Sequence, residues 1–467
     1  MIEIEIAGAG AGKTYGLAEK LLFTTHENPN CNKILFAITF TNKAKIKISE
    51  TIIELQGFIP KNIQIDTVHS FLLNEIIFPY SKFILNEVYT KAVSIPLSND
   101  EKLKNYKKAR LKEKQIIHNE DVYQKAKIII DKKNSKHSNK KKKEKVDFVI
   151  SHIKAITDKI FLDEVQDLDE DAFRIFEILG INSIPIYMIG DPKQAIKYPK
   201  AYEEFINICN QRNPEITKLL PLNNKSRRIP KELLIHSNRF CPLDQCQTSL
   251  SNIRGCAYYI SSDYIKLKEF IEQCTKTDCL VYIEEKEGIY HTHKESKLHF
   301  PITVEEKLRE IIDFVHYDVD LFIDSLLEFL TTNVQTLAPK IVLNNFLKGC
   351  RLTIESNEYA ELIQSLERVI VSKDGILVSS IDAVKGLESE KCLFILNENT
   401  LKYFFSENLE TEKYHNKIWK KIYVALTRSS CELIFVLDKD LLPKQDLLLL
   451  KTKFEKLGIT DYQPIIF

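Results

Sequence analysis

The sequence predicts an α/β protein made of two regions, each with a mostly parallel sheet and each interrupted by a small, mainly helical insertion. Three observations lead to this prediction. Short apolar runs alternate with helical patterns in both halves of the chain. Each run ends in a polar or glycine-containing turn, as strands do at the ligand-binding edge of a parallel sheet. Two long stretches break the alternation, and we interpret them as insertions.

Length and composition fit this plan. A chain of 467 residues is too long for one core, and contents of 44% apolar and 28% charged residues exclude wholesale disorder. The formal net charge is only +1, so a nucleic-acid surface must come from local clusters of Lys and Arg.

The N-terminus and the cysteines favour a cytoplasmic protein without a membrane partner. Met1 leads directly into an apolar strand pattern, which excludes an ordinary signal peptide. No apolar run approaches the ~18 residues that span a bilayer. The ten cysteines form no Cys-x-x-Cys pair, so we expect reduced thiols.

The first region reads as a strand, a glycine-rich turn and a helix, followed by further strands and helices. We expect strands at residues 2–7, 34–39, 63–67, 160–162 and 186–189, and helices at about 13–24, 43–55 and 171–179. Glu3 and Glu5 alternate with isoleucines, whereas a central parallel strand is usually apolar on both faces. We therefore expect a polar partner or solvent on one face of this strand.

The predicted domain boundaries follow the breaks in the pattern. The first region takes residues 1–71 and 146–216, with an insertion at 72–145. The second takes 217–284 and 369–467, with strands at 376–380, 392–396 and 433–437 and an insertion at 285–368. Residues 132–145 are rich in lysine and lack apolar periodicity, which suits a solvated loop or, alternatively, a DNA-binding segment.

Residues 7–14, Ala-Gly-Ala-Gly-Ala-Gly-Lys-Thr, predict a phosphate-binding loop. The glycines let backbone N–H groups converge on phosphate, Lys13 reaches the β and γ oxygens, and the Thr14 hydroxyl suits Mg²⁺. The first position is Ala7 where the usual pattern has Gly. ATP and Mg²⁺ are the expected cofactors.

Two adjacent carboxylates follow the apolar strand at 160–162. Asp163 is placed to hold Mg²⁺, and Glu164 to orient and deprotonate the attacking water. An acidic helix start is the alternative, which the phosphate loop makes less favourable. Gln194 follows another strand in Gly-Asp-Pro-Lys-Gln and is placed to sense the γ-phosphate.

The distal half supplies arginines and a carboxylate. Arg228 and Arg428 stand in Ser-Arg-Arg-Ile-Pro and Tyr-Val-Ala-Leu-Thr-Arg, and phosphoryl transfer commonly recruits an arginine from a second domain. Either arginine of the first string suits this role, and we prefer Arg228 over Arg227. Glu388, in Val-Lys-Gly-Leu-Glu, is a candidate for the ribose or for coupling to DNA.

Taken in order, these strings resemble the motifs of UvrD/Rep-type superfamily 1 helicases. The resemblance also covers Ile-Thr-Phe-Thr-Asn-Lys-Ala at 38–44 and Asp-Thr-Val-His-Ser-Phe at 66–71, and it extends over nearly the whole chain. It implies two RecA-like domains with ATP between them and single-stranded DNA, or its junction with duplex, across both. It further implies a translocase or helicase, usually moving from 3′ toward 5′.

The resemblance also implies residue roles. The ATPase site would use Glu164, Gln194, Arg228 and Arg428 in catalysis, Thr14 and Asp163 for Mg²⁺, and, for ATP, Ala7, Gly8, Ala9, Gly10, Ala11, Gly12, Lys13, Thr14 and Glu388. DNA would meet Thr39, Phe40, Thr41, Asn42, His69, Ser70 and Tyr198.

Besides Ala7, the chain departs from the family pattern in the small size of its insertions, in its front end and in its third motif. The phosphate loop begins at residue 7, without the upstream Gln that reads adenine, so we expect other nucleoside triphosphates to be accepted as well. In the third motif, Tyr198 or Tyr202 would replace the usual base-stacking aromatics in a shifted register. The alternative function is therefore a regulatory NTPase subunit that gates a partner nuclease in DNA repair or antiphage defence. Small UvrD-like subunits such as that of Gabija look similar in plan.

Overall fold

The computed structural model describes residues 1–463 except 28–31, 96, 98–100, 135, 138, 293–297, 299, 314–318, 370–374 and 406–414. Two sheets dominate the described part of the chain, with six and seven strands. Every strand pairing within these two sheets is parallel. The predicted α/β fold with two parallel sheets is confirmed.

The first sheet has the strand order β3-β2-β6-β7-β1-β8. Its strands are β1 (Ile2–Ile6), β2 (Ile34–Thr39), β3 (Ile63–Thr67), β6 (Thr157–Leu162), β7 (Ile186–Gly190) and β8 (Thr217–Leu219). Helices α1 (Lys13–Glu27) and α2 (Asn42–Gln56) share a core with one face. Helices α8 (Glu170–Ile181) and α9 (Ala201–Arg212) share a core with the other. The carboxyl ends of the central strands therefore form one edge between two helical layers.

The first insertion extends the core on the α8 face. It contains α3 (Val68–Phe71), the π-helical residues Leu72–Ile77, α4 (Phe78–Leu85), β4 (Lys91–Val93), α5 (Glu101–Glu113), β5 (Ile116–His118), α6 (Val122–Ile130) and α7 (Lys140–Ile156). The prediction of a lysine-rich loop up to residue 145 is wrong in its second half, where α7 begins. Asn139 caps this helix, accepting the Lys142 N–H at 2.9 Å, and Val146, Val149 and Ile153 anchor it in the core.

The second sheet has the order β13-β14-β12-β15-β16-β11-β17. Its strands are β11 (Cys256–Ser261), β12 (Leu280–Ile283), β13 (Tyr290–Thr292), β14 (Ile376–Ser380), β15 (Ser389–Ile395), β16 (Ser429–Leu437) and β17 (Thr460–Asp461). Around it lie α10 (Lys231–Asn238), α11 (Leu267–Thr275), α16 (Ile381–Val384), α17 (Glu398–Phe404), α19 (Lys417–Leu426) and α20 (Leu447–Lys456). A short pair, β9 (Lys225–Ser226) and β10 (Thr248–Ser249), precedes it.

Two predicted boundaries shift. Residues 217–219, expected to open the second region, form β8 and pair with β1 of the first sheet. Residues 290–292, expected in the second insertion, form β13 and pair with β14. Both strands are short, and their place is set by the partner strand rather than by an apolar pattern of their own.

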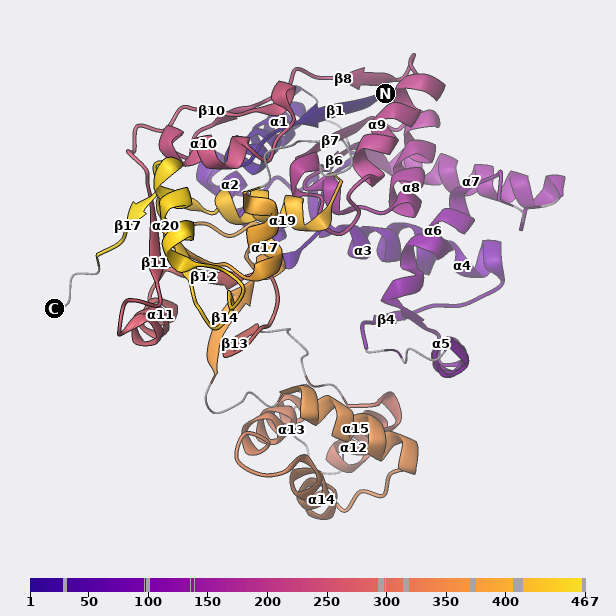
Figure 1. Cartoon of the computed structure of the whole chain (residues 1–467). Helices are drawn as coiled ribbons and strands as arrows, with labels where there is room; N and C mark the ends of the chain where they lie inside the picture. Colours follow the sequence, from indigo (N-terminus) through magenta and orange to yellow (C-terminus); the bar gives the residue numbers. More distant parts are fainter. Residues whose placement is uncertain are drawn as a thin grey trace.

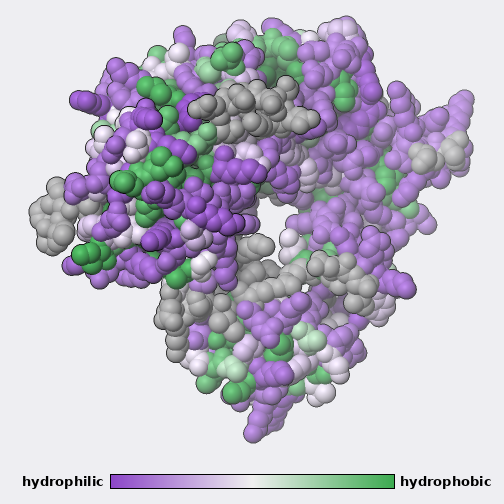
Figure 2. Space-filling view, viewed as in Figure 1, coloured by the Kyte–Doolittle hydropathy of each residue, from purple (hydrophilic) through white to green (hydrophobic). Residues whose placement is uncertain are grey.

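The second insertion is a four-helix unit with its own hydrophobic core. Its helices are α12 (Ile302–Asp313), α13 (Val319–Asn333), α14 (Pro339–Gly349) and α15 (Ser356–Val369), and they lie below the two sheets in Figure 1. Ion pairs join it to the first insertion, from Lys107 of α5 to Glu361 at 2.6 Å and from Lys114, just after α5, to Glu306. Figure 2 shows an opening between this unit and the two α/β regions, with hydrophilic residues around much of its rim.

No helix in the described ranges is long and apolar enough to cross a membrane. The described cysteines are all free thiols, as predicted.

The acidic residues of β1 have polar partners, as the alternation predicts. Glu3 pairs with Lys159 of β6 at 2.6 Å. Glu5 accepts a 2.6 Å hydrogen bond from the buried Tyr187 hydroxyl of β7 and lies 3.6 Å from Lys20 of α1. The face of β1 that looks toward α1 is therefore polar in the middle of the sheet.

We predict that Tyr187→Phe lowers the free energy of unfolding by about 1–2 kcal/mol, because a hydrogen bond to a charged carboxylate is lost. Urea denaturation measures the change. Tyr202→Phe is the matched control, since its hydroxyl donates only a 3.3 Å bond to the neutral Glu5 carbonyl. Equal losses in the two variants would contradict a special role for the Tyr187–Glu5 pair.

Candidate active site

The phosphate loop links the end of β1 to the start of α1. Gly10 and Gly12 have φ values of 71° and 79°, which glycine adopts without steric cost. Lys13 begins α1 and is 9% exposed. Second-region chain packs directly on the loop, where the Arg227 N–H donates to the Gly10 carbonyl at 2.9 Å. The loop is therefore shaped from both regions.

Thr14 and Asp163 meet at the foot of the loop. The Thr14 hydroxyl donates to Asp163 Oδ2 at 3.1 Å, and Asp163 directly follows β6. Burial raises the pKa of Asp163, and the nearby Glu164 charge raises it further. A hydroxyl and a desolvated carboxylate are oxygen donors of the kind that Mg²⁺ takes alongside phosphate oxygens. The residues present fit the ion expected from the sequence.

No cluster of three His, Cys, Asp or Glu side chains suited to a metal occurs among the described residues.

Glu164 is held in a strained position. Its φ of 54° lies in the left-handed region, which non-glycine residues rarely adopt. Its N–H donates to Asp163 Oδ1 at 2.9 Å, and its carboxylate accepts a hydrogen bond from the Gln166 amide. Burial opposes ionisation, but the positive charges of Lys13 and Lys385 lower the pKa of Glu164 below its usual value. Gln166 therefore fixes the direction of the Glu164 carboxylate, and a general base would need such a fixed direction.

Gln166 links Glu164 to the turn after β7. While its amide N–H donates to Glu164, its carbonyl accepts the Asp191 N–H at 3.0 Å. Asp191 is fully buried and pairs with Lys193 at 2.9 Å. Gln194, predicted as the γ-phosphate sensor, donates to Asp191 Oδ2 at 3.0 Å. The sequence did not assign a role to Gln166, two residues after Glu164, or to Asp191, which lies within the Gly-Asp-Pro-Lys-Gln string.

The second region brings two arginines to the site. Arg228 donates to the Glu388 carboxylate and, at 2.8 Å, to the Thr427 carbonyl. Arg428 is 2% exposed and donates to Val424 O, Leu387 O and Thr427 Oγ1 at 2.9, 3.2 and 2.9 Å. Burial, together with the Arg228 charge, lowers the pKa of Arg428 to about 10. Glu388, predicted to bind ATP, pairs here with Arg228 and lies 3.9 Å from Lys47.

A further ion pair crosses between the regions. Lys385 of the second region contacts Asp167, which follows Glu164 on the first. Burial raises the pKa of Asp167, and Lys385 opposes that rise. Glu164, its amide partner Gln166 and this ion pair therefore lie together at the boundary.

The residues predicted to touch DNA divide into two groups. Phe40 and Tyr198 both lie near Lys197, whose ammonium group is 5.2 Å and 5.6 Å from their ring centroids. His69 packs on Tyr123 of α6 with centroids 4.8 Å apart, and burial together with the Lys197 charge lowers the pKa of His69. Lys197 and Tyr123 were not predicted. These five side chains form an aromatic and cationic cluster.

Two of the other predicted contacts, Thr41 and Ser70, have local structural partners. Thr41 caps α2 by accepting the Ala44 N–H at 3.1 Å, and Ser70 donates its N–H to Thr67 Oγ1 at 3.2 Å. Asn42 is exposed at the start of α2, and Thr39 is buried. Tyr202, the other candidate for base stacking, is buried against Phe173, so that alternative is wrong.

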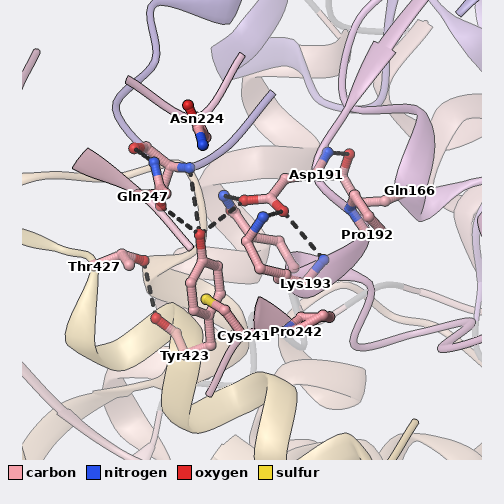
Figure 3. Close-up of polar contacts among 12 residues, drawn as sticks. Gln166, Asp191, Pro192, Lys193, Asn224, Cys241, Pro242, Gln247, Tyr423 and Thr427 are labelled. Carbon is pink, nitrogen blue, oxygen red and sulfur yellow. Dashed lines mark hydrogen bonds and ion pairs between the residues drawn. The ribbon is translucent and has the colours of Figure 1, made fainter. Parts of the chain in front are cut away.

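The buried Tyr423 hydroxyl connects α19 to the phosphate loop, and the sequence did not predict this contact. The Tyr423 hydroxyl lies among Ala9, Asp191 and Gln247, as Figure 3 shows. The segment that contains Gln247 carries no recognised motif. Tyr423 lies in the Tyr-Val-Ala-Leu-Thr-Arg string, in which only Arg428 was assigned a role.

Two parallel sheets with a phosphate loop, an acidic pair and arginines facing them define a P-loop NTPase architecture. Residues 2–199 match the family model described as an AAA domain. The chain is similar to a probable DNA helicase II homolog of Mycoplasma capricolum, with 24% identity over 57% of this chain and 44% of that protein. It is also similar to the Gabija protein GajB of Bacillus cereus, with 29% identity over 41% of this chain and 36% of that protein.

These matches confirm the resemblance to UvrD/Rep-type helicases, including the Gabija protein, that the motifs indicate. The matches span less than half the length of either curated relative. Among solved structures, the chain is similar to the arterivirus helicase nonstructural protein 10, with 9% identity, a TM-score of 0.35, and coverage of 93% of this chain and 59% of that one.

We predict that Gln166→Leu lowers the rate of nucleotide hydrolysis about tenfold or more, because Glu164 loses the amide that aims it. Nucleotide affinity should change little, since Lys13 and Thr14 are untouched. Steady-state kinetics and equilibrium binding of a fluorescent nucleotide separate these effects. A Gln166→Leu protein with wild-type turnover would contradict the positioning role.

Proposed function

We propose that this chain hydrolyses ATP at the boundary between its two α/β regions and uses the cycle to move along single-stranded DNA from 3′ toward 5′. The observation that carries the proposal is the arrangement around Glu164. The base and the phosphate loop lie on the first region, and Lys385, Arg228 and Arg428 approach from the second. Such a two-sided site couples hydrolysis to relative movement of its halves.

The chemistry follows from the contacts. Lys13 and the loop N–H groups would bind the β- and γ-phosphates. Thr14 and Asp163 would hold Mg²⁺, which when bound neutralises phosphate charge. Glu164 takes a proton from water, the water oxygen bonds to the γ-phosphorus, and the bond to the β-phosphate oxygen breaks. Arg228 and Arg428 stabilise the negative charge that develops.

A second function is favoured by specific observations. The chain is similar to a protein named Gabija protein GajB, and burial of Tyr202 leaves Tyr198 as the aromatic side chain of the third motif at the cluster. Both suit an NTPase that regulates a partner nuclease in defence or repair without processive movement. Movement on DNA distinguishes the two functions.

We predict that Glu164→Gln lowers ATP hydrolysis by about 10²-fold or more, because the general base is lost. Glu170→Gln, an exposed carboxylate at the start of α8, is the matched control and should hydrolyse normally. Phosphate release is measured with and without single-stranded DNA. Normal hydrolysis by Glu164→Gln would overturn the assignment of the site.

The motor is tested in parallel by displacement of streptavidin from biotin at either end of a single-stranded oligonucleotide. The translocase should displace it from the 5′ end and not from the 3′ end. Hydrolysis without displacement from either end would reject the motor and favour the regulatory function.

We predict that Phe40→Ala or Tyr198→Ala weakens binding of single-stranded DNA by about 1–3 kcal/mol, the usual contribution of a stacked base. Fluorescence anisotropy with labelled oligothymidine gives the affinity. Phe23→Ala is the control, because Phe23 is 62% exposed on α1 and outside the cluster. Lys197→Ala should reduce the slope of affinity against salt by about one charge. Unchanged affinity in both aromatic variants would place the DNA elsewhere.

A further inference from the structure

The two sides of the site are joined by a buried hydrogen-bond network around Tyr423. This side chain projects from α19 of the second region into the space between the phosphate loop and the turn after β7 (Figure 3). Its hydroxyl oxygen lies 3.4 Å from the Ala9 N–H nitrogen, 3.1 Å from Asp191 Oδ2 and 2.7 Å from Gln247 Oε1. One phenol group thus contacts the phosphate loop, the third motif and a second-region glutamine.

Gln247 makes a second contact with the phosphate loop. Its amide N–H donates to the Ala9 carbonyl at 2.8 Å, so both backbone polar atoms of Ala9 are bound by second-region side chains. Asn238 fixes the Gln247 backbone through bonds of 2.9 Å and 2.8 Å. Gly8 lies so close to this amide that a Cβ at Gly8 would collide with it. The fit is tight, and Gln247 is 3% exposed.

The Tyr423 hydroxyl has one proton and two acceptors. While accepting the Ala9 N–H, it donates either to the Asp191 carboxylate or to the Gln247 carbonyl, but not to both at once. Asp191 is also bound by Lys193 and Gln194, so its charge is already compensated on the first region. The network therefore has two hydrogen-bonding arrangements that differ in whether Tyr423 is attached to the third motif.

We propose that Tyr423 and Gln247 are positioning residues. They hold the second region against the phosphate loop and make its position depend on the hydrogen bonding of Asp191. This inference rests on the proposed ATPase function. Lys13 and Thr14, which would bind the phosphates, and Asp163, which would hold Mg²⁺ with Thr14, belong to the first region. Arg228 and Arg428 belong to the second. Loss of the network should therefore impair turnover and spare binding.

The test compares Tyr423→Phe, Gln247→Leu and the double variant in the full chain. Each single change should lower kcat about threefold to tenfold, the rate equivalent of a lost hydrogen bond, with KM for ATP within about twofold of wild type. Because both residues act on Ala9, the double variant should be little worse than the worse single variant.

Tyr282→Phe is the matched control. Tyr282 is also a fully buried second-region tyrosine, but its hydroxyl donates at 2.6 Å to the Ala425 carbonyl and lies outside the network. This variant should lose thermal stability by an amount similar to Tyr423→Phe while keeping the wild-type kcat. A purely structural role for Tyr423 would make the two variants behave alike.

A second measurement does not depend on turnover. Trp419, the single tryptophan of the chain, lies one turn before Tyr423 on α19. Its emission should respond to a non-hydrolysable ATP analogue in the wild type and respond much less in Tyr423→Phe.

The outcomes distinguish a failure of the positioning role from a failure of the proposed ATPase function. Wild-type kcat in both single variants, or equal effects of Tyr423→Phe and Tyr282→Phe, would overturn the positioning role while leaving the ATPase intact. Absence of hydrolysis in the wild type, with Lys13→Ala indistinguishable from it, would overturn the proposed function itself and this inference with it.

Discussion

Several carboxylates crowd the carboxyl edge of the first sheet, and the compensation of their charge constrains how the two regions meet. Asp163 and Asp191 are almost completely removed from solvent, and an uncompensated charge in such a place costs several kcal/mol. Lys13 and Lys193 come from the first region itself. Asp167, by contrast, is paired by Lys385 of the second. The charge balance at the sheet edge therefore includes an ion pair, Asp167 with Lys385, that crosses between the regions.

The cationic side of the boundary is organised differently. Arg428 directs its three hydrogen bonds to groups within the second region, so its guanidinium moves with α19 as a unit. Arg228 is shared between Glu388 and the Thr427 carbonyl, and Glu388 also approaches Lys47 of α2. A triphosphate would compete with Glu388 for Arg228. Arg228 and Glu388 both belong to the second region, whereas the approach of Glu388 to Lys47 crosses to the first region.

The sequence could predict much of this site because parallel strands end at one edge. Lys13, Asp163 and the third-motif turn each follow a strand with a clear apolar pattern, so their proximity was predictable. Residues placed by packing were not. Gln247 reaches Ala9 from a loop whose sequence carries no motif, and Tyr123 reaches His69 from an insertion helix. Likewise β8 has no apolar pattern, and its pairing with β1 defines it. The roles of the site residues stay predictions.

The conformation of Glu164 follows from the sequence and the structure together, and not from the sequence alone. The sequence places a carboxylate after Asp163, but an acidic pair at the end of a strand is equally suited to starting a helix. In the structure the backbone at Glu164 turns into the left-handed region, and Gln166 and Asp163 hold it there. Strain of this kind persists only where surrounding contacts over-determine it. Because Gln166 also binds the Asp191 N–H, the same side chain that aims the base is attached to the turn that contacts Tyr423. The position of the Glu164 carboxylate and the contact between the regions are thus linked through Gln166.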